Sequence, residues 1–151
     1  MKKILFICKA NVGRSQIAEA VYNNYTKSNK AISIAGCEDR KEKYNGKPSI
    51  KITDFIIKKG IDMLNQNINF ITDFHIKDIE NIEKVIFLYN PIKENIIDRN
   101  CMINGISPYK YFLKNFPDKI TILDIKDPYN LGLNEIEDIY LDIDNLVKKI
   151  I

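Results

Sequence analysis

The segment best suited to catalysis begins at a cysteine and ends just after an arginine six residues later. The segment joins an apolar run to a helical pattern, and it reads Cys8-Lys9-Ala10-Asn11-Val12-Gly13-Arg14-Ser15. Main-chain N–H groups at a helix N-terminus bind anions, and small residues let a loop approach a phosphate closely. The planar fork of Arg14 can grip two phosphate oxygens. Because these positive surroundings favour the thiolate form of Cys8, the sulfur could attack phosphorus and form a phosphocysteine.

Two carboxylates near the end of the chain are candidates for proton transfer. Asp127 precedes Pro128, which favours an extended conformation that projects the carboxylate from its loop. If this loop faces Cys8, Asp127 can protonate the leaving-group oxygen as a general acid. We expect Asp124 to be structural, at the end of a strand. Tyr129 could form one wall of the site by stacking on an aromatic substrate.

Each of these features also has an ordinary interpretation. A cysteine at a strand end can be a small buried hydrophobe, and an Asp-Pro pair can be a plain turn with a surface tyrosine after it. We expect His75, the single histidine, to be a surface residue, and we expect residues 41–47 to form a solvated loop. The Cys8 segment gains weight from its position between a predicted strand and a predicted helix.

Apolar runs alternate with helical patterns along the chain. The predicted strands cover residues 4–8, 31–35, 84–88 and 120–124. The predicted helices cover residues 15–25, a segment that begins at Pro48 and ends at Gly60, one or two segments around 91–98 and 108–115, and residues 134–150. This alternation predicts βαβ units, a parallel sheet and helices on both faces. Ligand sites in such sheets lie beyond the carboxyl ends of the strands, where the segments after strands one and four would meet.

Composition limits the classes of protein to consider. The chain has 151 residues, of which 45% are apolar and 28% charged, so we expect residues 1–151 to form one globular domain. A dispersed net charge of +3 does not indicate a nucleic-acid partner. No segment is long and apolar enough to span a membrane, so we expect a cytoplasmic protein without a membrane partner.

The cysteines do not indicate a structural framework. Cys8, Cys37 and Cys101 are odd in number and widely spaced, which does not fit a set of disulfides. With no Cys-x-x-Cys pair and one histidine, we expect neither a zinc site nor another metal. A reactive cysteine remains possible.

The motifs together resemble the low-molecular-weight protein tyrosine phosphatases. Cys8-x5-Arg14-Ser15 with Asn11 inside is similar to the signature loop of that family. The resemblance extends to the segments 35–37 (Ala-Gly-Cys), 60–62 (Gly-Ile-Asp) and 127–129 (Asp-Pro-Tyr). It implies a three-layer α/β/α fold whose four-stranded parallel sheet has the order 2-1-3-4. It also implies hydrolysis of phosphate monoesters, chiefly protein phosphotyrosine, through a phosphocysteine and without a cofactor.

The resemblance also implies roles for single residues. Cys8 would be the nucleophile, Arg14 the transition-state clamp and Asp127 the general acid. Asn11 would hold the loop in shape, and Ser15 would donate a hydrogen bond to the thiolate. A phosphorylated protein, a small aryl phosphate, inorganic phosphate or another oxyanion would be held by Lys9, Ala10, Asn11, Val12, Gly13, Arg14, Ser15 and Tyr129.

The loop also departs from the family pattern. Ala10 replaces a usual glycine, and Gly13 stands where many members carry a second cysteine that can form a protective disulfide with the nucleophile. Gln16 replaces a common proline, and residues 14–19 resemble the related thiol-linked arsenate reductases. Arsenate mimics phosphate, so a reductase that uses an external thiol is an alternative function.

Two further alternatives are less consistent with the sequence. An internal cysteine relay would need a cysteine after strand three, where this chain has Tyr89, and neither Cys37 nor Cys101 matches. A non-catalytic anion-binding module is the other alternative. The retention of Cys8, Arg14 and Asp127 together argues against that module.

Overall fold

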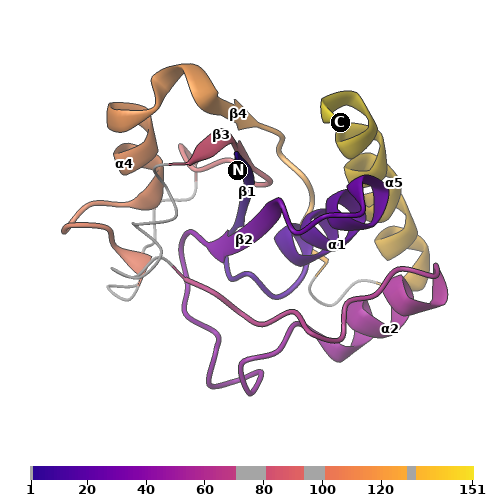
Figure 1. Ribbon diagram of the computed structural model, residues 1–151. Coiled ribbons are helices and arrows are strands. Elements are labelled where there is room, and N and C mark those ends of the chain that lie inside the picture. Colours follow the sequence, from indigo (N-terminus) through magenta and orange to yellow (C-terminus); the bar gives the residue numbers. More distant parts are fainter. Residues whose placement is uncertain (1, 71–80, 94–100, 129–131) are drawn as a thin grey trace.

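The computed structural model describes residues 2–70, 81–93, 101–128 and 132–151. Its centre is a parallel sheet with the strand order β2-β1-β3-β4 (Figure 1). The strands are β1 (Lys3–Cys8), β2 (Ala31–Ala35), β3 (Ile82–Phe87) and β4 (Ile120–Ile122). The predicted fold class and strand order are therefore confirmed.

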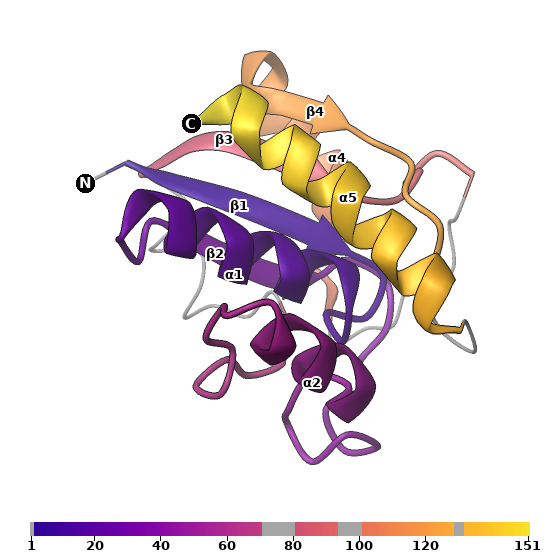
Figure 2. The same cartoon turned by 90° about the vertical axis from the view of Figure 1, so that its right-hand side faces the viewer.

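Helices cover both faces of the sheet. They are α1 (Arg14–Thr26), α2 (Ile50–Lys58), α4 (Pro108–Asn115) and α5 (Leu133–Ile150), with a short 3-10 turn at Pro117–Lys119. Helices α1 and α5 lie on one face with α2 at their end, and α4 lies on the opposite face (Figures 1 and 2). This arrangement is what right-handed β-α-β crossovers produce in a parallel sheet.

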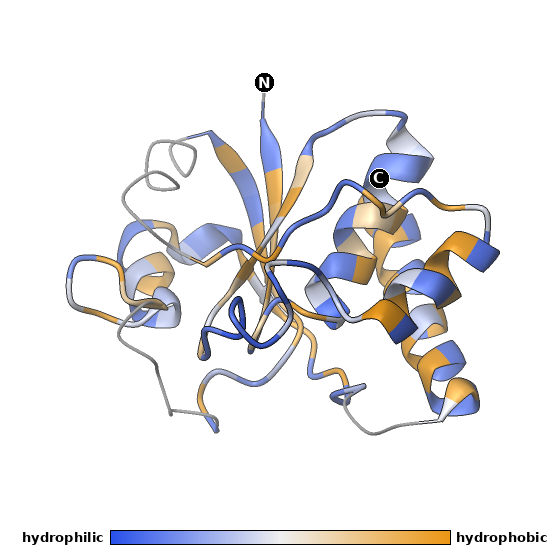
Figure 3. Cartoon of the chain, turned by 90° about the horizontal axis from the view of Figure 1, so that it is seen from below, coloured by the Kyte–Doolittle hydropathy of each residue, from blue (hydrophilic) through white to orange (hydrophobic). Residues whose placement is uncertain are grey.

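Strand β1 shows how the sequence builds two cores. Its side chains are buried on both faces, as expected for the centre of a parallel sheet. Phe6 and Cys8 pack with α1, α2 and α5, whereas Leu5 and Ile7 pack with Phe112 of α4. In Figure 3 the hydrophobic colouring follows the central strands, and the helices carry polar residues on their outer sides. The alternation places the Cys8 side chain on the α1 and α5 face.

Four strand boundaries differ from the prediction, and two of them, the start of β1 and the end of β3, differ by a single residue. Strand β3 begins at Ile82 rather than residue 84. Lys3 pairs with Ile82 there, across a shift in register, and the polar residues of this segment hide that pairing in the sequence. Strand β4 ends at Ile122 rather than residue 124. The Leu123 N–H still donates to the Phe87 carbonyl at 2.8 Å, but the chain then leaves the sheet. Asp124 is therefore an exposed residue beyond the strand.

The helices predicted at 15–25, 48–60, 108–115 and 134–150 are confirmed to within two residues at each end, whereas residues 91–93 form a turn. Helix α2 is followed by Gly60 with a φ of +81°, a left-handed conformation that suits glycine after a helix end. Most of the segment around 91–98 lies outside the described residues. Among the helices that the model describes, none combines the length and the apolar character needed to cross a membrane.

Candidate active site

The loop between β1 and α1 is shaped by one residue in a left-handed conformation. Asn11 has a φ of +58°, and its side chain is fully buried. The carbonyl of Lys9 accepts from the N–H groups of Cys37 and Glu38, and that of Val12 accepts from the Ser49 N–H at 3.0 Å. These main-chain bonds attach the loop to the segments after β2 and before α2.

The sulfur of Cys8 lies inside this loop and has polar neighbours. It lies 2.9 Å from the Ser15 hydroxyl oxygen, and the Asn11 N–H donates to it at 3.2 Å. The loop therefore surrounds the sulfur with groups that can stabilise a negative charge.

The Arg14 side chain is held by main-chain carbonyls of two strand ends. It is 4% exposed, and Nη1 donates to the carbonyls of Leu88 at 3.3 Å and Ile125 at 2.8 Å. Its Nη2 lies 3.8 Å from Oδ2 of Asp127. Because these carbonyls follow β3 and β4, the early end of β4 has a clear consequence: it brings Ile125 and Asp127 to the arginine.

Gly13 allows the Asp127 loop to approach the Cys8 loop. A Cβ atom at this position would lie 2.8 Å from Cγ of Pro128, closer than real Cβ contacts. Any side chain here would have to displace Pro128 or be displaced by it. Gly13 and Pro128 therefore form a close contact that holds the two loops side by side.

One cavity collects most of the residues predicted from the sequence. It has a volume of about 150 Å³ and is lined by Cys8, Lys9, Ala10, Val12, Gly13, Arg14, Glu38, Arg40, Tyr44, Asp127 and Pro128. Asn11 and Ser15 lie behind its wall, in contact with the sulfur. Asp124 does not line it, and Tyr129 and His75 lie outside the described residues.

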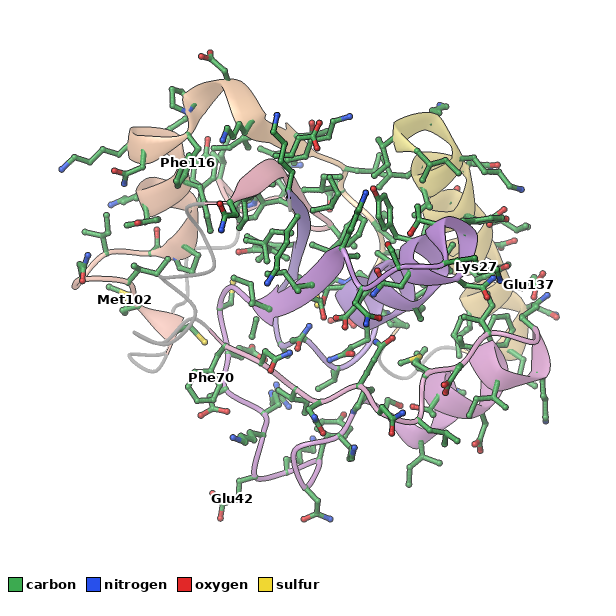
Figure 4. All side chains as sticks on the ribbon, viewed as in Figure 1. Lys27, Glu42, Phe70, Met102, Phe116 and Glu137 are labelled. Carbon is green, nitrogen blue, oxygen red and sulfur yellow. The ribbon has the colours of Figure 1, made fainter. Side chains whose placement is uncertain are left out.

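Sequence reasoning missed three residues of this cavity. Glu38, Arg40 and Tyr44 come from the segment after β2. Arg40 forms an ion pair with Glu38, with Nη2 to Oε2 at 2.8 Å. Residues 41–47, which were predicted to form a solvated loop, continue this segment. Glu42 lies at their outer end and points away from the sheet (Figure 4). Their polar composition matched an exposed loop, so no sequence signal separated Tyr44 from its neighbours.

Gln16 anchors the loop from the side of helix α1. Its Nε2 lies within 2.9 Å of the carbonyl and side-chain oxygens of Asn11 and 2.8 Å from the Asn67 carbonyl. Gln66 in turn donates to the side-chain oxygen of Gln16 at 2.7 Å. The glutamine therefore connects the Cys8 loop to the segment before the undescribed residues 71–80.

A second cavity, of about 570 Å³, lies beside α1 and β2 and has a half-buried carboxyl in its wall. This carboxyl belongs to Glu19, which accepts a hydrogen bond from the Ser33 hydroxyl at 2.5 Å. Burial raises the pKa of Glu19 from 4.5 to about 7, although the hydrogen bonds from Ser33 act to lower it. The ionised form of Glu19 is thus disfavoured by folding.

We expect Glu19→Gln to change how stability depends on pH. Because the folded-state pKa lies above the unfolded value of 4.5, the contribution of Glu19 to the free energy of unfolding is fully present below pH 4.5. It is lost as the pH rises through about 7. Glutamine cannot ionise. When the pH is raised from about 5 to about 8, the free energy of unfolding of the variant should therefore increase relative to that of the natural chain, by at most about 3 kcal/mol.

Urea unfolding at the two pH values measures this difference. Asp62→Asn is the matched control, since Asp62 lines the same cavity but is exposed. That variant should follow the pH dependence of the natural chain. A Glu19→Gln stability difference that is equal at both pH values would contradict the prediction.

Comparison with known proteins places this site in a family. Residues 3–151 match the family model described as low molecular weight phosphotyrosine protein phosphatase. No curated protein sequence matches the chain.

Solved structures share the fold over nearly the full length of both chains. A low molecular weight protein tyrosine phosphatase from T. tengcongensis is 18% identical, with a TM-score of 0.70 over 99% of this chain and 97% of that chain. The YwlE arginine phosphatase from Geobacillus stearothermophilus is 17% identical, with a TM-score of 0.67 over 99% and 90%. An arsenate reductase from Archaeoglobus fulgidus is 18% identical, with a TM-score of 0.64 over 98% of each chain. From the match of the family model, this chain belongs to the low molecular weight phosphotyrosine protein phosphatase family.

Proposed function

We propose that residues 1–151 form one catalytic domain that hydrolyses phosphotyrosine in proteins through a phosphocysteine on Cys8. The observation that carries this proposal is the single cavity in which the Cys8 sulfur, the Arg14 guanidinium and the Asp127 carboxylate meet. Membership of the phosphotyrosine phosphatase family supports the same reaction.

In the first step the Cys8 thiolate attacks phosphorus and the bond to the tyrosyl oxygen breaks. The guanidinium has five N–H donors. Those on Nη1 go to the Leu88 and Ile125 carbonyls, so Nε and Nη2 are the pair offered to the oxygens of the transferring phosphoryl group. Asp127 delivers its proton to the departing phenolate, which leaves as neutral tyrosine.

In the second step water hydrolyses the phosphocysteine. Asp127, now a carboxylate, removes a proton from the water as its oxygen attacks phosphorus. Inorganic phosphate is released and the Cys8 thiolate is restored, stabilised by Ser15 and the Asn11 N–H. No electron transfer and no cofactor enter this cycle.

The rim of the cavity is compatible with an aromatic phosphate ester. Tyr44 lines the cavity and offers a ring on which the tyrosyl ring of a substrate can stack. Tyr129 is proposed as a second wall, on the family resemblance alone. Other oxyanions would occupy the same loop, and we propose a cytoplasmic location without a nucleic-acid or membrane partner.

A turnover assay with four substrates tests the proposal. Phosphotyrosine and a simple aryl phosphate should be hydrolysed in the presence of a metal chelator, much faster than phosphoarginine. Arsenate with a small external thiol should not be reduced at a comparable rate. Arsenate reduction without phosphatase turnover would assign the chain to the reductase function. Phosphate binding without either activity would make it an anion-binding module.

A further inference from the structure

The Asn11 amide is the branch point of a hydrogen-bond chain that reaches beyond the active site. Its Nδ2 donates to the Ser15 hydroxyl at 2.7 Å and to the Ser33 hydroxyl at 2.9 Å. Ser15 lies 2.9 Å from the Cys8 sulfur, and Ser33 donates to Glu19. One arm of this chain therefore ends at the nucleophile and the other at a carboxyl group on α1.

The direction of every bond in the two arms follows from counting protons. An amide nitrogen has two protons, and both are used by the two serines. Each serine oxygen accepts one of them, so its own single proton must be donated elsewhere. For Ser15 the remaining partner is the Cys8 sulfur, and for Ser33 it is Oε2 of Glu19.

The opposite end of the Asn11 amide fixes its orientation. Oδ1 accepts from Gln16 Nε2 at 2.9 Å and from the Asn69 N–H at 2.7 Å. A flipped amide would face these two donors with its own N–H₂ group. The carboxyl oxygen of Glu19 completes the arrangement, because it takes the Ser33 proton and leaves the lone pairs of Ser33 to face Asn11.

Glu19 itself lies outside the catalytic cavity. It lies on α1 between Ser15 and the helix end, and it lines the cavity of about 570 Å³ together with Lys27 and Asp62. Figure 4 shows Lys27 at the far end of that helix. The catalytic cycle needs nothing from this carboxyl, yet two hydrogen bonds through buried groups connect it to Asn11.

We propose that Glu19 is a positioning residue for the nucleophile, holding Ser33 so that Asn11 and Ser15 keep the Cys8 sulfur in its hydrogen-bonded, reactive state. This role rests on the proposed function of Cys8 as nucleophile. It predicts that loss of the acceptor at Glu19 and loss of the hydroxyl at Ser33 have the same effect, because both break one chain.

The experiment measures the rate of iodoacetamide alkylation of Cys8 across a range of pH, with the modified peptide identified by mass. This readout reports the sulfur without requiring phosphatase turnover, so it separates failure of this proposal from failure of the proposed function. The variants are Glu19→Leu, Ser33→Ala, their combination and Glu19→Gln. Asp62→Asn is the control, because it removes a carboxylate from the same cavity without touching the chain.

We expect Glu19→Leu and Ser33→Ala each to slow alkylation about tenfold near neutral pH and to move the profile to higher pH. The double variant should be no slower than either single variant, since coupled sites are not additive. Glu19→Gln keeps an oxygen acceptor for Ser33 and should alkylate like the natural chain, as should Asp62→Asn.

Other outcomes overturn the proposal. Alkylation at the natural rate in folded Ser33→Ala would show that the arm through Ser33 does not reach the sulfur, even if Glu19→Leu fails to fold. Multiplied effects in the double variant would mean two independent roles. A Glu19→Gln defect as large as that of Glu19→Leu would assign the effect to charge rather than to the hydrogen bond.

Discussion

Cys8→Ser should reduce phosphotyrosine turnover by on the order of 10⁵–10⁶-fold, the size of loss seen when a covalent nucleophile is removed. A serine hydroxyl is a much weaker nucleophile than the sulfur, which Ser15 and the Asn11 N–H contact in the natural chain. Phosphate binding should remain, because the main-chain N–H groups and Arg14 grip the anion without the sulfur. Steady-state kinetics gives the first quantity. Stabilisation of the fold by added phosphate gives the second.

Cys101→Ser is the matched control for this variant. Cys101 is also a buried cysteine, but it does not line the catalytic cavity. Its variant should keep turnover near the natural rate for each folded molecule, even if the buried hydroxyl lowers stability. Residual Cys8→Ser activity close to that of the control would remove Cys8 from the mechanism. A loss of phosphate binding would mean that the sulfur itself carries part of the anion's affinity.

The meeting of Cys8, Asn11 and Arg14 in one loop was predictable from the sequence, for a local reason. Cys8, Asn11 and Arg14 lie within seven residues between one strand and one helix, so their meeting depends on a single turn. Within this turn Asn11 adopts a left-handed conformation, which asparagine tolerates better than most residues. The strand order was also predicted correctly, but on the family resemblance, since the crossover rules alone leave several orders open.

The missed residues depend on contacts between distant segments. Tyr44 reaches the cavity because main-chain bonds anchor the segment after β2 to Lys9, a contact that no periodicity encodes. Ser33 looks like a polar interruption of an apolar strand, and only the fold reveals that it faces both Glu19 and Asn11. Strand β4 is shorter than predicted for a similar reason. The strand pattern in the sequence continues past the end of β4, but the carbonyl of Ile125 accepts a hydrogen bond from the distant Arg14 side chain, a contact that the sequence pattern does not show.

Asp127→Asn is expected to slow hydrolysis in proportion to how much the leaving group needs a proton. Asparagine keeps the size of the side chain but has no proton of comparable acidity to give. General acid catalysis contributes roughly 10²–10⁴-fold, so phosphotyrosine hydrolysis should fall within that range. A very acidic phenol leaves as a stable anion, and its phosphate ester should be hydrolysed with a much smaller loss. The measurement is a plot of rate against leaving-group pKa, taken in single-turnover conditions so that release of phosphate from the cysteine does not mask the first step.

Asp124→Asn provides the comparison that makes this result specific. Asp124 lies three residues earlier on the same exposed segment but outside the catalytic cavity, so it tests whether any carboxylate on this loop would serve. Its plot should coincide with that of the natural chain, while the plot for Asp127→Asn should fall more steeply as leaving-group pKa rises. The reverse order of slopes would transfer the acid role to Asp124. Shallow slopes for all three proteins would mean that the proton comes from neither carboxylate. In that case the 3.8 Å approach of Asp127 to Arg14 would serve to orient the guanidinium instead.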